Sequence, residues 1–111
     1  MECPTITDLK LDKNSLEGLD RIRKNQALSN ALATTIGVTV FATTVSTKSA
    51  IETSYNIMSN EWELFALSMR AIPSIARERL KQEAALQILD HAKDSKQKQF
   101  WTAIYEGCSI K

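Results

Sequence analysis

The hydrophobic and polar positions of this chain define a charged N-terminal part, a long uncharged run and a charged C-terminal half. The uncharged run covers residues 27–45, ALSNALATTIGVTVFATTV, and it is rich in threonine. If this run is a helix, apolar side chains cover every side of it. Such a segment must be buried in a core, in a seam between subunits or in a lipid bilayer. The environment that buries this segment therefore bears directly on the function of the protein.

The pattern before and through this run predicts one long helix over residues 14–57. Asn14 followed by Glu17 is the spacing of a capping box, which starts a helix. Apolar residues then recur at helical spacing, and no proline interrupts the chain until position 73. Residues 1–13 are expected to form an extended arm, in which the alternation around Leu9 and Leu11 allows one short strand.

A strand is the alternative for part of the uncharged run. Ile36, Val38 and Val40 lie at alternate positions among β-branched neighbours, which locally is a strand pattern. We favour a helix because the chain offers no second good strand to pair with this one. Threonine is tolerated in an apolar helix because its hydroxyl can bond to a carbonyl one turn earlier. A strand here would pair with another copy of the protein.

Three shorter helices are predicted after the long one, over residues 60–72, 74–93 and 96–106. Pro73 separates the first two, and the polar stretch at 94–99 is either a solvated helical segment or a break with Asp94 or Ser95 as a new cap. The helix over 74–93 carries two adjacent apolar stripes, so we expect it to pack against two neighbours. The first stripe contains Ala85, Leu86, Leu89 and Ala92, and the second contains Leu80, Ala84 and Ile88.

These elements predict an all-α fold for residues 1–111, a three- to four-helix hairpin or bundle with one long N-terminal helix. The low glycine and proline content agrees with long helices, because few residues favour tight turns. Hydrophobic residues make up 43 % of the chain and charged residues 24 %, as in ordinary globular proteins, which argues against disorder of the whole chain.

The charged and reactive residues do not form a recognisable catalytic or metal-binding motif. The two cysteines, Cys3 and Cys108, lie far apart, so they are either free thiols or a bridge between the termini. His91 is the only histidine, and we expect it at the surface near a helix C-terminus. We therefore predict no enzyme activity, no cofactor and no metal site.

The function we expect is protein–protein interaction or assembly through helix packing, as in a small inhibitor, an immunity protein or a self-assembling subunit. The protein partner is a second copy or another chain, and we expect a homo-oligomer. Aromatic residues outside the uncharged run serve as anchors in this interpretation, although they also fit the core of a small domain. The candidate contact residues are Leu28, Leu32, Ile36, Val40, Phe41, Trp62, Phe65 and Trp101.

Two other functions stay open. Residues 25–47 are uncharged and long enough to span a bilayer, with basic residues on both sides, although the threonines lower the hydropathy. Arg21, Arg23 and Lys24 form the densest basic cluster and are candidate phosphate contacts in a nucleic-acid-binding protein. The net charge of +1 gives no overall attraction to nucleic acid. The polar N-terminus lacks a signal peptide, which predicts a cytoplasmic protein, with membrane association or signal-independent export as alternatives.

Overall fold

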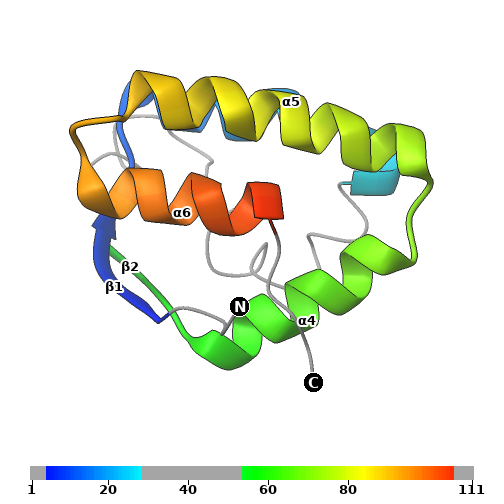
Figure 1. The fold of residues 1–111 in the computed structure, drawn as a ribbon, viewed down its shortest axis with the longest axis horizontal. Helices are drawn as coiled ribbons and strands as arrows, with labels where there is room; N and C mark the ends of the chain where they lie inside the picture. Colours follow the sequence, from blue (N-terminus) through cyan, green and yellow to red (C-terminus); the bar gives the residue numbers. More distant parts are fainter. Residues whose placement is uncertain (1–4, 29–53, 107–111) are drawn as a thin grey trace.

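The computed structural model describes residues 5–28 and 54–106 of the chain. Over these ranges it is mostly helical, with one small two-stranded antiparallel sheet (Figure 1). The helical character is as predicted, but an all-α fold is not, because two segments are strands. The elements are β1 (Ile6–Lys10), α1 (Lys13–Arg23), β2 (Ser54–Ile57), α4 (Ser59–Arg70), α5 (Ser74–Asp90) and α6 (Ser95–Glu106).

The sheet forms between the N-terminal arm and a segment that the sequence pattern assigned to a helix. Ile6 pairs with Ile57 and Leu9 with Tyr55, and the register shifts between these two pairs. Asp8 occupies this irregularity with a φ of 54°, a left-handed conformation that Asp tolerates better than most residues. The Asp8 backbone N–H donates to Asn56 Oδ1 at 2.8 Å, which satisfies a group that the irregular pairing leaves free.

The expected helix over residues 14–57 differs from the structure at both of its ends. Helix α1 begins at Lys13 and ends at Arg23, and residues 54–57 are strand β2. The first helix stops because Asn25 accepts a hydrogen bond from the backbone N–H of Leu28 at 3.2 Å, which caps a new helical turn. The expected cap at Asn14 is also displaced, since Asp12 is the N-cap and accepts from the Ser15 N–H at 2.8 Å.

The three C-terminal helices correspond to the predicted ones, within a few residues at their ends. In α4, Glu61 accepts a hydrogen bond from the Met58 N–H at 2.7 Å and so stabilises the helix start. Pro73 precedes α5 and cannot donate a backbone hydrogen bond, which separates α5 from α4. The polar stretch after α5 is a break, and Asp94 accepts from the Gln97 N–H at 3.1 Å to begin α6.

The core collects apolar side chains from every described element. Helices α5 and α6 lie alongside each other, α1 packs against α5, and β1 packs against α6 (Figure 1). Each large side chain buried in this way stabilises the fold by about 1.5–3 kcal/mol. The largest fully buried side chains are Trp62, Trp101, Phe65, Phe100, Ile6, Leu9, Leu11, Leu19, Leu28 and Ile57.

Candidate functional site

The aromatic residues proposed as anchors lie in the core. Trp62, Phe65 and Trp101 are at most 1 % exposed. The ring centroids of Trp62 and Phe65 are 5.6 Å apart, and those of Trp62 and Phe100 are 5.9 Å apart, which are separations of favourable aromatic pairs. These side chains therefore hold α4 and α6 together and are not an accessible binding patch.

The remaining candidate contacts fall into two groups. Leu28 is buried in the same core. The other four, Leu32, Ile36, Val40 and Phe41, lie outside the described residues, as do most of the candidate membrane span at 25–47 and both cysteines. Over residues 5–28 and 54–106, no helix is both long enough and apolar enough to cross a membrane.

His91 is buried, contrary to the expectation of a surface histidine. Its Nε2 lies 2.8 Å from Asp12 Oδ2, and its Nδ1 lies 2.8 Å from the carbonyl oxygen of Gln87. The ring therefore lies between two acceptors, one from the start of α1 and one from α5. Sequence spacing could not reveal this contact, because Asp12 and His91 are 79 positions apart.

Ser15 completes a buried polar network around this histidine. Its hydroxyl donates to Gln97 Oε1 at 2.6 Å and accepts from Trp101 Nε1 at 3.0 Å. The Ser15 oxygen is also 3.4 Å from His91 Nε2. The network joins the start of α1 to the end of α5 and the start of α6.

The combination of serine, histidine and aspartate in this network does not have the geometry of a nucleophilic triad. A triad histidine uses one nitrogen for the serine and the other for the acid. Here Asp12 and Ser15 approach the same nitrogen, and the Ser15 proton is engaged by Gln97. Ser15 is also fully buried. We infer that this network fixes helices relative to one another.

Two carboxyl groups of this region have lowered pKa values. Burial raises the pKa of Asp12, but hydrogen bonds from the Ser15 N–H and from His91 outweigh it, so the pKa lies below its usual value. The pKa of Asp94 is lowered because the side chain and backbone of Gln97 donate hydrogen bonds to it. Both carboxylates are therefore stabilised in their charged form by the fold.

The outer face of α5 carries large apolar side chains that stay mostly exposed. Ile75, Leu86 and Leu89 are 70 %, 58 % and 75 % exposed. Gln82 is exposed on the same face, and the resulting spacing of seven, four and three positions is that of a helix-packing seam. We call Ile75, Gln82, Leu86 and Leu89 the α5 outer face. Helix α5 packs against two neighbours, α6 and α1, as predicted. Of the two stripes, the one with Leu80 and Ala84 is buried, whereas Leu86 and Leu89 of the other stay exposed, although Leu86 also lines a groove beside α1.

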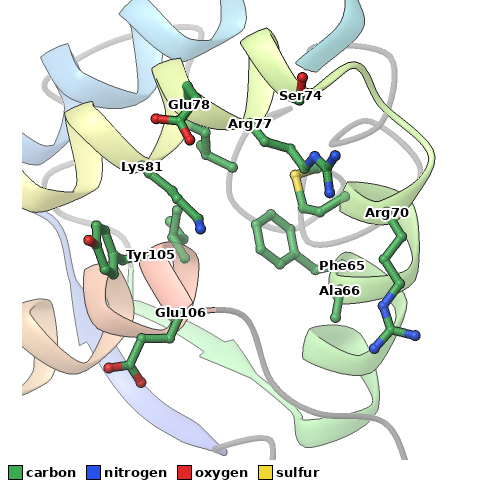
Figure 2. Close-up of a pocket in the computed structure, with 12 residues that line it drawn as sticks. Phe65, Ala66, Arg70, Ser74, Arg77, Glu78, Lys81, Tyr105 and Glu106 are labelled. Atoms are coloured by element: carbon green, nitrogen blue, oxygen red, sulfur yellow. The ribbon is translucent and has the colours of Figure 1, made fainter.

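A groove of about 430 Å³ lies on the other side of α5, between α4, α5 and α6 (Figure 2). Its apolar lining includes Phe65, Met69, Leu80 and Ile104. Arg77 extends from α5 toward Phe65, while Glu78 points away from the groove (Figure 2). We call this cavity the α4–α6 groove.

The basic cluster predicted to contact phosphate is partly occupied by ion pairs. Arg21 Nη2 lies 2.6 Å from Glu83 Oε1, which links α1 to α5, and Lys24 Nζ lies 3.6 Å from Asp20. Arg79 joins Arg21 and Lys24 around a second groove of about 460 Å³. Nothing is described of the Arg23 side chain. Phosphate binding here stays a prediction.

The comparisons with known proteins identify no relative. No protein-family model, no curated protein and no solved structure matches this chain. Among the residues that the structure describes, no group of histidine, cysteine, aspartate and glutamate side chains could hold a metal ion.

Proposed function

We propose that this chain is a non-enzymatic assembly protein that associates with a second copy of itself through the α5 outer face. The observation that supports this proposal is the exposure of Ile75, Leu86 and Leu89 on one side of the longest described helix. Large apolar side chains that are exposed together mark interaction surfaces more often than isolated ones do.

The two sides of α5 explain why its outer face suits a partner helix. The inner side buries Ala76, Leu80 and Ala84 in the core. The outer face lies on the opposite side of the helix, so its residues cannot reach that core. A partner helix would remove the three large outer side chains from water, at about 25 cal/mol for each Å² of apolar surface buried.

The charges along α5 favour a second, antiparallel copy as that partner. The first half of the helix contains three bases and one acid, whereas the second half contains two acids and no base. In an antiparallel pair the first half of each helix lies against the second half of its partner, so Arg79 at the edge of the outer face approaches the acidic half. Arg77 and Lys81 line the α4–α6 groove instead, and Glu83 already pairs with Arg21, so the charges contribute only modestly to this orientation. The bases are Arg77, Arg79 and Lys81, and the acids are Glu78 in the first half and Glu83 and Asp90 in the second.

The apolar positions agree with the same arrangement. If the two-fold axis passes near Gln82, Ile75 of each helix faces Leu89 of its partner. Gln82 then faces Gln82, whose side-chain amide can both donate and accept a hydrogen bond. Such a contact uses the same surface on both subunits, as a two-fold symmetric dimer requires.

The first test is the molar mass of the full chain by light scattering on a size-exclusion column, over a concentration series. We expect a dimer at high concentration and a monomer for the double variant Leu86→Lys, Leu89→Lys. Leu64→Lys is the matched control, because Leu64 is about as exposed but lies on α4. A wild-type chain that stays monomeric, or a control that dissociates equally, would overturn the proposal.

A second test distinguishes antiparallel from parallel association. Single cysteines at positions 75 and 82 are introduced into a chain with Cys3→Ser and Cys108→Ser. In the antiparallel pair, Gln82→Cys lies near the axis and crosslinks to itself. Ile75→Cys does not, because the two copies of position 75 are roughly 20 Å apart along the axis at 1.5 Å per residue. Efficient crosslinking at position 75 would contradict the antiparallel arrangement.

A further inference from the structure

The α4–α6 groove combines an apolar floor with cations, and this combination is independent of the self-association proposed above. Phe65 is 1 % exposed, while Leu80 and Ile104 are 2 % and 3 % exposed. These side chains belong to the hydrophobic core. The volume of the groove, about 430 Å³, lies within the range of small-molecule sites.

The charges that point into this groove are basic. Figure 2 shows Arg77 and Lys81 directed into it from α5, whereas the carboxylates of Glu78 and Glu106 are directed away. Lys81 Nζ lies 5.9 Å from the centre of the Tyr105 ring at the edge of the groove. An anion in the groove would therefore lie near two cations, while the carboxylates that line the groove point away from it.

Arg77 has an unused hydrogen-bond donor beside the apolar floor. Its Nε is buried and has no hydrogen-bond partner among the residues that the structure describes. A buried donor without a partner is unfavourable, and for a charged group the cost is larger still. A carboxylate satisfies a guanidinium well because its two oxygens match two parallel N–H groups.

We propose that the α4–α6 groove binds an aliphatic monocarboxylate. The carboxylate accepts hydrogen bonds from the terminal nitrogens of the Arg77 guanidinium and lies within the field of Lys81. The apolar chain of the ligand lies on Phe65, Met69 and Ile104. Carboxylate is favoured over phosphate, since the groove offers one planar guanidinium and one ammonium group beside apolar side chains.

The test uses octanoate as the probe, with binding to the full chain measured by calorimetry. Octanamide has the same shape without the charge, so we expect it to bind at least about tenfold more weakly, a difference equal to about 1.4 kcal/mol. Backbone amide signals of Ser74, Arg77 and Tyr105 should shift in a ¹⁵N–¹H titration with octanoate, which locates the ligand in the groove.

Two variants separate the role of Arg77 from the loss of one charge. Arg77→Gln should weaken octanoate binding about tenfold or more. Arg79→Gln, on the same helix but outside the groove lining, should leave it unchanged. Thermal unfolding of both variants shows whether they fold.

Four outcomes would overturn the proposal: no octanoate binding, equal binding of octanamide, equal weakening by Arg79→Gln, or shifts outside the groove. A short peptide with an apolar side chain and a free C-terminal carboxylate is the competing source of the same chemistry. If it binds more tightly than octanoate, while its C-terminal amide does not, the ligand is a protein terminus and the aliphatic assignment is wrong.

Discussion

Asp12 Oδ2 lies 2.8 Å from Nε2 of His91, which ties the start of α1 to the end of α5. The Asp12 side chain is half exposed whereas that of His91 is 4 % exposed. The contact therefore joins a buried ring to a carboxylate that still reaches solvent. Four predictions follow from this junction and from the packing around it.

We expect acid to destabilise the fold partly through Asp12. Its pKa is lower in the folded chain than the usual value of about 3.9. A lowered folded pKa contributes stability above the unfolded value, and this contribution is lost as the pH falls through the folded pKa. Urea midpoints should thus drop between pH 6 and pH 3. The drop should be smaller in Asp12→Asn, and an equal drop in the two proteins would contradict this assignment.

Ser15→Ala should destabilise the fold by about 1–3 kcal/mol, because it leaves the buried Trp101 Nε1 without a hydrogen bond, although Gln97 Oε1 keeps the one from the Asp12 N–H. Trp101 Nε1 would lose its acceptor and Gln97 Oε1 would lose a donor at 2.6 Å. Urea unfolding at neutral pH measures the loss. Ser74→Ala is the control, since Ser74 is exposed and such changes stay within about 0.5 kcal/mol.

Gly18→Ala should destabilise the fold although alanine is the better helix former. A Cβ at this position would lie 2.6 Å from Gln87 Nε2 and 2.8 Å from Glu83 Oε1. Gln87 cannot move aside freely, because it is buried and its Nε2 donates to the Asn14 carbonyl oxygen at 3.1 Å. Crowding of this kind costs about 1–3 kcal/mol, against a gain in helix propensity of up to about 1 kcal/mol.

A double-mutant cycle checks the cause at Gly18. In a Gln87→Ala background the nearer obstacle is removed and only Glu83 Oε1 at 2.8 Å remains, so Gly18→Ala should cost less than it does in the wild-type chain. If Gly18→Ala is equally harmful in both backgrounds, Gln87 is not the obstacle.

Arg21→Gln should reduce stability by less than about 1 kcal/mol, because the Arg21 side chain is half exposed and such ion pairs contribute little. The loss should shrink as salt is added, since salt screens exposed charges. Thermal unfolding at low and high salt measures it, with Lys24→Gln as the control for a weaker pair. A loss that is independent of salt would indicate a packing role for Arg21.

The parts of the fold that the sequence predicted depend on local signals. Pro73 separates α4 from α5, and Asp94 caps α6, and each acts on neighbouring residues. The apolar spacing of Trp62, Phe65, Ala66 and Met69 is a local signal of the same kind, and all four side chains are buried on one side of α4. Such features need no knowledge of the rest of the chain.

The parts that sequence reasoning missed depend on distant partners. Tyr55 and Ile57 are alternately buried as in a strand, but they pair with Leu9 and Ile6, about 50 positions earlier. The alternation of apolar and polar residues around Leu9 allowed a strand, but the sequence pattern identified no second strand to pair with it. The burial of His91 follows from Asp12 and Ser15 in the same way. The end of α1 is an exception, because Asn25 acts locally and the pattern did not reveal its capping role.

The contact of β1 with α6 has a consequence for how the chain folds as it is synthesised. Strand β1 leaves the ribosome well before α6, yet the Lys96 ammonium group that donates to the Thr7 carbonyl oxygen at 2.8 Å belongs to that later helix. Contacts of such large sequence separation form late and slowly. Until α6 emerges, the apolar side chains of β1 and α1 lack part of their cover, and the nascent chain is then most prone to aggregation.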